Sequence, residues 1–281
     1  MSTISLNNFW SRTLTGALFV IIIIGSILIS QASFSILFLG VTLLAIREFY
    51  ILVNHVKGLK VQLVPGMIAA GVLYVSVALV SMDYVGKQLL IINLILPVML
   101  FVNELYQKNE TPIQNISLTL LGILYVSIPL ALLNMFFNPG LVPGEYHPAA
   151  LLGFFVILWS SDTFAYVSGK LIGRRKLFPR ISPKKTWEGT LGGFLFGLIA
   201  AWILSEFYHD FSRANWLIIA GIIMIFGTFG DLAESLIKRS LKIKDSGRAL
   251  PGHGGLLDRF DAALFAAPAV FIYINLIPYL K

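Results

Sequence analysis

Residues 235–261 combine many charges with flexible backbone in a chain that is otherwise mostly apolar. The segment reads SLIKRSLKIKDSGRALPGHGGLLDRFD and holds six basic residues, three aspartates, one histidine and four glycines. Hydrophobic residues make up 57% of the chain and charged residues only 12%, against about 25% charged in a soluble domain. So much charge here indicates that something polar and multiply charged binds. Cations, glycine amides and paired carboxylates suit a nucleoside triphosphate with its metal ion.

A polar stripe begins just before this segment. It consists of Asp231, Glu234, Ser235 and Lys238, whose spacing of i, i+3, i+4 and i+7 places them on one face of a helix. An aspartate inside an apolar helix costs about 2.5–3.5 kcal/mol to insert and is by default a functional candidate. We interpret Asp231 as a metal ligand or proton-transfer site. The alternative is an Asp–Lys pair that only stabilises helix packing.

A glycine-rich loop leads into the last apolar run. His253, Gly254 and Gly255 form its centre, and glycine lets backbone N–H groups approach phosphate oxygens closely. The loop precedes a helix N-terminus, where anions are favoured. Asp258 and Asp261 are one helical turn apart and can present carboxylates to one Mg²⁺ ion. The alternative is a plain turn whose acids complement the helix dipole.

A third group of candidates lies upstream. Asp162 is a second aspartate in an apolar run, which favours a shared polar cavity over two unrelated packing accidents. Ser182, Lys184 and Lys185 lie in the polar loop that follows, and lysine binds phosphate as a point charge. The basic cluster at residues 174–176 of the same loop has an alternative role as an anchor on anionic lipid.

Nine apolar runs must position these residues. A helix needs about 20 apolar residues to cross the hydrocarbon core, and backbone groups in lipid must be satisfied within the helix. We therefore expect an all-α, polytopic integral membrane protein with about nine transmembrane helices. We expect one integral membrane domain over residues 1–281, with N-terminal spans in 1–148 and catalytic spans and loops in 149–281. The runs are residues 13–29, 33–53, 63–82, 89–103, 116–137, 149–171, 189–208, 215–236 and 262–280.

The distribution of positive charge predicts the orientation. With the N-terminus in the cytoplasm, only Lys87, Arg213 and Lys281 fall outside, which leaves 18 of the 21 lysines and arginines on the cytoplasmic side. The positive-inside rule favours this arrangement, with the C-terminus outside. The same bias explains the net charge of +7 without a nucleic-acid partner. The chain has no cysteine, which excludes disulfides and thiolate metal sites.

At these residues the chain resembles the phosphatidate cytidylyltransferase family, also called CDP-diacylglycerol synthases, of the bacterial type. A second family block, SPKKTWEG, is present at residues 182–189, and the resemblance covers residues 159–261. The longer family signature appears here as Ser235, Lys238-Arg239, Lys244-Asp245, His253-Gly254-Gly255 and Asp258-Arg259-Phe260-Asp261.

The resemblance implies a reaction in phospholipid biosynthesis, in which CTP and phosphatidate give CDP-diacylglycerol and pyrophosphate. It implies a multi-pass protein of the cell inner (cytoplasmic) membrane, in contact with membrane lipids, with a homodimer among the expectations. Mg²⁺ is implied as cofactor, held by Asp231 and Asp258, with a monovalent cation such as K⁺ beside it. We expect catalytic roles for Asp231, Asp258, Lys238, Arg239, Lys244 and Arg259, and nucleotide or metal binding by Ser182, Lys184, Lys185, His253, Gly254, Gly255, Asp162 and Asp261.

Two other functions stay open at this point. A CTP-dependent lipid kinase acting on a polyprenol or phytol would have similar membrane architecture, but it would release CDP instead of pyrophosphate. An ion-coupled transporter would use Asp162 and Asp231 as an ion relay. The concentration of charge at the cytoplasmic edge weighs against the transporter.

Overall fold

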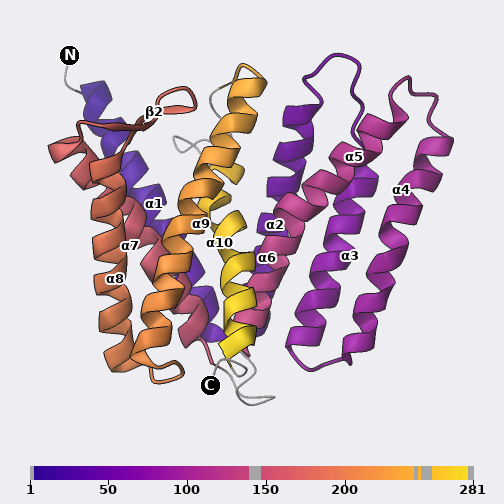
Figure 1. The fold of residues 1–281 in the computed structure, drawn as a ribbon. Helices are drawn as coiled ribbons and strands as arrows, with labels where there is room; N and C mark the ends of the chain where they lie inside the picture. The colour runs from indigo at the N-terminus through magenta and orange to yellow at the C-terminus, as the bar shows by residue number, and fades with distance from the viewer. Residues whose placement is uncertain (1–2, 139–146, 244–245, 248–254, 278–281) are drawn as a thin grey trace. The chain divides into compact units, whose positions relative to one another are not determined.

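A computed structural model describes residues 3–138, 147–243, 246–247 and 255–277, the side chains from residue 15 onward (Figure 1). Most of the described residues are helical, as expected for an all-α protein. It divides into two compact units. The first unit comprises residues 1–134 with 245–259, and the second comprises residues 135–244 with 260–281. The single domain over 1–281 stays a prediction.

The first unit is built mainly of the helices in residues 3–134. The polar break that separates the first two apolar runs is a capping box: Ser30 Oγ accepts from the Ser33 N–H at 3.1 Å, and Ser33 Oγ accepts from the Ser30 N–H at 3.2 Å. These bonds satisfy helix-end donors and turn the chain. The elements are α1 (Thr3–Ile29), α2 (Gln31–Val53), α3 (Leu63–Ser81), η1 (Lys87–Leu94), α4 (Ile95–Leu105), α5 (Pro112–Gly122), η2 (Ile123–Ser127) and α6 (Ile128–Leu132). The short helix η3 (Leu133–Phe137) begins in this unit and ends in the second.

A buried polar network holds α3, α4 and α5 together. The Glu104 carboxylate, 4% exposed, accepts from Gln62 Nε2 at 2.6 Å and from the amide nitrogens of Asn109 and Asn115, each at 2.9 Å. Both carboxylate oxygens are therefore satisfied, which is what a buried charge requires. This carboxylate has a structural role.

The second unit consists of α7 (Ala149–Ile172), the hairpin β1 (Lys176–Phe178) and β2 (Ser182–Thr186), α8 (Trp187–Phe207), α9 (Arg213–Ser240) and most of α10 (Leu257–Leu276). Helices α7, α8 and α9 lie side by side (Figure 1). Glycines four residues apart on α8 allow the close approach to α7: a Cβ at Gly189 would lie 2.8 Å from the Ala165 carbonyl oxygen, and one at Gly193 2.6 Å from that of Ser161.

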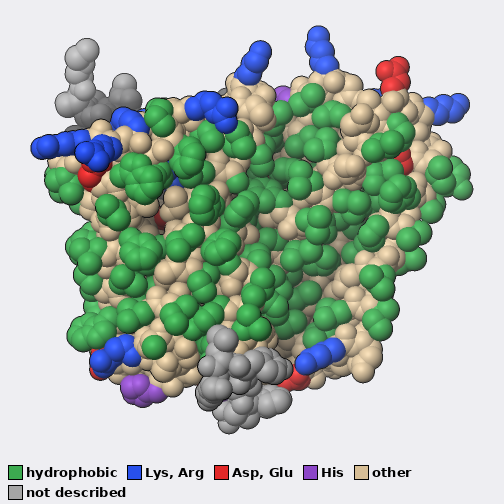
Figure 2. All heavy atoms as spheres, viewed as in Figure 1, with side chains coloured by type: hydrophobic (Ala, Val, Ile, Leu, Met, Phe, Trp, Pro, Cys, Tyr) green, Lys and Arg blue, Asp and Glu red, His purple; other side chains and the backbone are tan. Residues whose placement is uncertain are grey.

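Among the described residues, seven stretches of helix are long and apolar enough to cross a membrane. On the face drawn in Figure 2, most of the surface is apolar, and the lysines and arginines lie toward the ends of the helices. The first predicted span is represented by the apolar stretch Thr15–Ile29, which is shorter than the seven, and the ninth by α10. The seven are Gln31–Val53, Leu63–Ser81, Lys87–Leu105, Pro112–Phe137, Ala149–Ile172, Trp187–Phe207 and Arg213–Ser240.

Candidate active site

The hairpin between α7 and α8 carries the lysines of the SPKKTWEG block. Its strands are antiparallel, with Lys176 opposite Thr186 and Phe178 opposite Ser182. Thr186 ends the hairpin and caps α8, because its Oγ1 accepts from the Gly189 N–H at 3.2 Å. The cap ties β2 to the start of α8. The lysines therefore extend from a strand that is fixed at its end.

Glu188 holds the other side of the hairpin. Its carboxylate accepts from the Arg174 N–H at 3.0 Å and from the Arg175 N–H at 3.1 Å. A carboxylate in the first turn of α8 also complements the helix dipole. The hairpin is thus anchored where the chain enters it from α7 and where it leaves toward α8.

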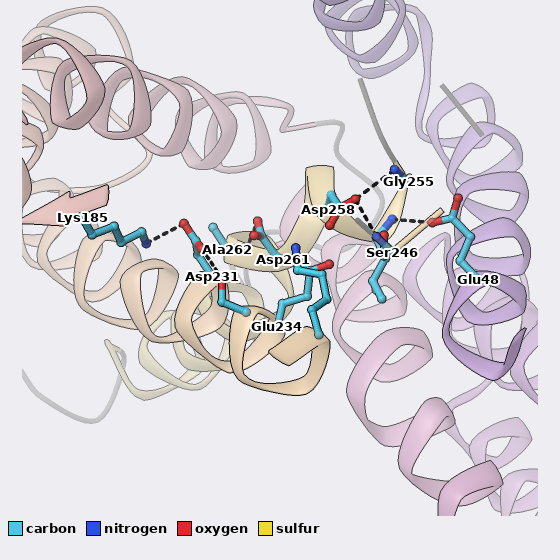
Figure 3. Close-up of polar contacts among 12 residues, drawn as sticks. Glu48, Lys185, Asp231, Glu234, Ser246, Gly255, Asp258, Asp261 and Ala262 are labelled. Carbon is cyan, nitrogen blue, oxygen red and sulfur yellow. Dashed lines mark hydrogen bonds and ion pairs between the residues drawn. The ribbon is translucent and has the colours of Figure 1, made fainter. Parts of the chain in front are cut away.

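Lys185 and Asp231 form the central ion pair of the second unit. Lys185 Nζ lies 2.5 Å from Asp231 Oδ2, and the side chains are 26% and 36% exposed (Figure 3). Ser235, one turn farther along α9, donates from Oγ to Asp231 Oδ1 at 3.4 Å. Because both side chains remain partly exposed to solvent, the ion pair is weak, and either group can bind another charged partner instead.

Two further aspartates surround this pair. Asp162 of α7 is close enough to Asp231 and Lys185 for their charges to act on it. Asp261 of α10 is close enough to Asp231 and Asp162 for their charges to act on it. Gathered carboxylates repel one another unless cations or protons neutralise them. The cluster therefore favours a bound cation.

A close helix crossing brings Asp261 beside α9. A Cβ at Gly230 would collide with the Asp261 carbonyl oxygen and lie 3.2 Å from Ala262 Cα. Only glycine permits this approach of the two backbones. The residue preceding Asp231 therefore lets α10 lie against α9, as Figure 3 shows for Asp231, Asp261 and Ala262.

The ion pair opens onto a cavity of about 640 Å³ within the second unit. The charged residues of its lining are Asp162, Lys170, Lys184, Lys185 and Asp231, and most of the other lining residues are apolar. Such a cavity suits a ligand that is charged at one end and apolar at the other. The apolar lining includes Tyr166, Phe178, Trp187, Phe194, Ile225 and Phe229.

In the first unit, Asp258 accepts hydrogen bonds from backbone N–H groups on both sides of residues 248–254, which hold most of the glycine-rich loop. Its Oδ2 accepts from the Ser246 N–H at 3.1 Å and from the Gly255 N–H at 2.9 Å (Figure 3). Beside them, the Leu257 N–H donates to Glu48 Oε2 at 2.9 Å. The sequence left open that Asp258 only stabilises a turn and the start of a helix. The two backbone hydrogen bonds show that Asp258 does stabilise the turn.

The other predicted residues vary in their placement. Lys238 forms an ion pair with Glu234 at 2.9 Å. The Asp–Lys pair considered as an alternative for the α9 stripe is therefore a Glu–Lys pair. Arg239 and Arg259 are exposed, and Ser182 lies in the hairpin opposite Phe178. Asp231 and Asp258 belong to different units, so their shared metal site stays a prediction. Three predicted residues, Lys244, His253 and Gly254, lie outside the described residues.

The donor set of the second unit fits magnesium. Within the described ranges, no group of three or more His, Cys, Asp or Glu side chains is arranged to hold a metal ion. Mg²⁺ does not need such a cage, because it is usually bound by one or two carboxylates, with waters and substrate phosphates as its other ligands. The Asp231 carboxylate, with Asp162 and Asp261 nearby, offers oxygen ligands of the required kind.

Two acids that the structure places at these loops, Glu48 and Glu188, were not predicted from the sequence. The signal for Glu48 was a lone carboxylate in the apolar run 33–53, the same kind of signal that singled out Asp162. The signal for Glu188 was an acid in the first turn of a helix.

Comparisons with known proteins identify the family of the chain. The model of the Cytidylyltransferase family matches residues 10–277. The phosphatidate cytidylyltransferase of Staphylococcus haemolyticus (strain JCSC1435) is 34% identical over 266 residues, covering 94% of this chain and 98% of the relative. The protein of the same name from Staphylococcus aureus (strain N315) is 36% identical over 271 residues, with 94% and 98% covered. That of Bacillus subtilis (strain 168) is 32% identical over 271 residues, with 94% and 97% covered.

Proposed function

The chain belongs to the cytidylyltransferase family, and from this membership we propose that it transfers the cytidylyl group of CTP to phosphatidate. The products are CDP-diacylglycerol and pyrophosphate. The observation that carries the proposal is the similarity to phosphatidate cytidylyltransferases over 94% of the chain. The cavity of the second unit supports it, since a charged end and apolar walls match a phosphate headgroup on acyl chains.

The reaction needs no nucleophile from the protein. A phosphate oxygen of phosphatidate attacks the α-phosphorus of CTP, a new P–O–P linkage forms, and the bond to the β-phosphate breaks as pyrophosphate leaves. Both reactants are anions, so the protein must orient them in line and offset their repulsion. Lys184 and Lys185 on the cavity wall supply positive charge for this purpose.

We assign the metal site to Asp231 and Asp258. Bound Mg²⁺ supplies charge neutralisation of the triphosphate and of the leaving pyrophosphate. Asp162 and Asp261 orient or support the metal ligands, and the basic residues Lys238, Arg239, Lys244 and Arg259 contact phosphates. A monovalent cation such as K⁺ beside the magnesium completes the proposed set.

The proposed membrane arrangement has nine spans, with the N-terminus in the cytoplasm and the C-terminus outside. It adds residues 13–29 and 262–280 to the seven spanning helices. This arrangement places the polar loops 170–188 and 238–259 on the cytoplasmic side of the inner membrane. CTP is then available from the cytoplasm and phosphatidate from the inner leaflet.

The test is a product assay with purified protein, phosphatidate, Mg²⁺ and CTP labelled at the α-phosphate. We expect label in CDP-diacylglycerol and the release of pyrophosphate. The same assay with a polyprenol or phytol in place of phosphatidate tests the lipid kinase, which would release labelled CDP and form a phosphorylated lipid alcohol. Ion flux in proteoliposomes that lack CTP would indicate the transporter.

A further inference from the structure

Glu48 is a buried carboxylate in α2 that contacts the glycine-rich loop. The residue is 7% exposed and stands in the apolar run of α2. Its Oε2 accepts from the Leu257 N–H at 2.9 Å, at the start of α10 (Figure 3). Its Oε1 is buried and has no hydrogen-bond partner among the described residues. The carboxylate therefore has only part of the polar contact that its burial requires.

The backbone of the loop packs directly on this carboxylate. A Cβ at Gly247 would lie 2.6 Å from Glu48 Oε1, and a Cβ at Gly255 would lie 2.7 Å from Glu48 Oε2. Any side chain at either position would displace the carboxylate or the loop. Two glycines on opposite sides of the loop thus approach a single side chain of α2.

Asp258 completes this arrangement from the other side. It accepts from Ser246 and Gly255, while Glu48 accepts from Leu257. Two carboxylates, one from α2 and one from α10, together hold both ends of the loop and the first turn of the helix. Glu48 binds the backbone of Leu257, and Asp258 is the next residue, so a shift of Glu48 would move Asp258 as well.

Packing alone does not explain a carboxylate at position 48. Burying a charge with incomplete hydrogen bonding is costly, and an apolar side chain would fill the same space without that cost. The positive end of the α10 dipole offsets part of it. Glu104 shows the contrast, since its carboxylate is buried in the same unit but receives side-chain hydrogen bonds from Gln62, Asn109 and Asn115.

We propose that Glu48 is a positioning residue for the cytidylyl-transfer site: it fixes the start of α10 and the end of the glycine-rich loop, and through them the direction of the Asp258 carboxylate. This role rests on the proposed function, because it concerns the same metal and nucleotide. It gives the N-terminal spans a part in catalysis without requiring Glu48 to touch either substrate.

The test compares Glu48→Ala, Glu48→Gln and Glu48→Asp with Glu104→Gln as a matched buried carboxylate. Glu48→Ala removes both charge and acceptor, whereas Glu48→Gln keeps an acceptor for the Leu257 N–H. We expect Glu48→Ala to raise the KM for CTP and the half-saturating Mg²⁺ concentration by about 10- to 100-fold, the usual effect of losing a group that orients a metal ligand. Glu48→Gln and Glu48→Asp should give smaller increases, and the KM for phosphatidate should stay unchanged. Glu104→Gln should lower the Tm while leaving all three kinetic constants unchanged.

Amide hydrogen exchange gives a second readout that does not depend on activity. Glu48→Ala should speed exchange at the Leu257 and Gly255 amides, while Glu104→Gln should not. If Glu48→Ala changes only the Tm, and neither the CTP and Mg²⁺ constants nor these two amides, the proposal is wrong. If the wild-type protein does not transfer cytidylyl groups, the proposed function fails, and the exchange rates still decide whether Glu48 orders the loop. If Glu48→Ala does not fold, Glu48→Gln and Glu48→Asp carry the same comparison.

Discussion

At the scale of single residues, the acids of the two units have different partners. Asp231 pairs with a lysine side chain at 2.5 Å, and Asp258 accepts from two backbone N–H groups. A lysine side chain moves with little resistance, whereas a backbone donor moves only with its loop. We therefore expect Asp231 to exchange its partner readily on binding a ligand, and Asp258 to depend on the order of the loop around it.

Replacing Asp231 by asparagine tests its role directly. The variant keeps the shape of the side chain but removes the charge that binds a cation. We expect kcat to fall on the order of 10²–10³-fold, the size of effect seen when a group that stabilises developing charge is removed. The measurement is transfer of labelled CMP to phosphatidate, with membrane insertion checked in parallel.

Glu206→Gln is the matched control for this variant. Glu206 also forms an ion pair, with Arg213 at 2.5 Å, but it lies at the opposite end of α8 from the hairpin. The activity of the Glu206→Gln variant should equal that of the wild type. Full activity in Asp231→Asn would contradict the metal assignment.

Acids within apolar runs were recognisable from the sequence alone. Asp162 and Asp231 stand out in this way, and the structure brings their charges together. The role of Glu48 was not predictable, because its hydrogen-bond partner lies 209 residues away. The Lys185–Asp231 pair was missed for the same reason, since no local periodicity relates a loop lysine to a helix two elements later.

At the scale of elements, glycine spacing sets the distance between α7 and α8. Apolar length predicted both helices, but not how closely they pack. The hairpin was not predicted either, because its strands are only 3 and 5 residues long and mostly polar. What defines the hairpin is its anchoring by Glu188 and Thr186, and these bonds require the helix beside it.

Adding one methyl group at Gly193 tests this packing. The Cβ would lie 2.6 Å from the Ser161 carbonyl oxygen and 2.8 Å from Ala165 Cβ, so the helices must separate. We expect Gly193→Ala to lower the free energy of unfolding by about 1–3 kcal/mol, the usual cost of overpacking. The measurement is thermal unfolding in detergent.

Gly221→Ala in α9 provides the comparison. A Cβ there meets no described atom within 4 Å, and alanine is a better helix former than glycine. The Tm should therefore stay the same or rise slightly. Equal destabilisation by both alanines would mean that close packing of α7 and α8 does not matter.

At the scale of the whole molecule, metal dependence should be visible in both activity and stability. We expect a chelator to abolish cytidylyl transfer and added Mg²⁺ to restore it. Because a ligand stabilises the folded protein by RT ln(1 + [L]/Kd), a saturating concentration near 100 times Kd should add about 2.7 kcal/mol. The Tm should rise with CTP and Mg²⁺ together in the wild type and stay constant in Asp231→Asn. A rise of equal size in both proteins would contradict a metal-nucleotide site at Asp231.

The absence of cysteine allows a clean test of the proposed orientation. Lys57 and Lys87 are exposed residues on opposite sides of α3 in the sequence. A membrane-impermeant maleimide should label Lys87→Cys in intact spheroplasts, and Lys57→Cys only after the membrane is permeabilised. The reverse pattern would place the N-terminus outside.

The apolar lining of the cavity determines which measure of phosphatidate concentration, in the membrane or in the bulk sample, should set the reaction rate. Tyr166, Trp187 and Phe229 line the cavity and are 69%, 53% and 53% exposed. Withdrawing a fatty acyl chain from a bilayer costs about 0.8 kcal/mol per methylene, hence about 12 kcal/mol for about fifteen of them. A lipid that keeps its tails in the bilayer while its headgroup reacts avoids this cost. The reaction rate should therefore follow the mole fraction of phosphatidate in the membrane plane, and dilution with inert lipid should slow turnover even when the bulk amount of substrate is constant.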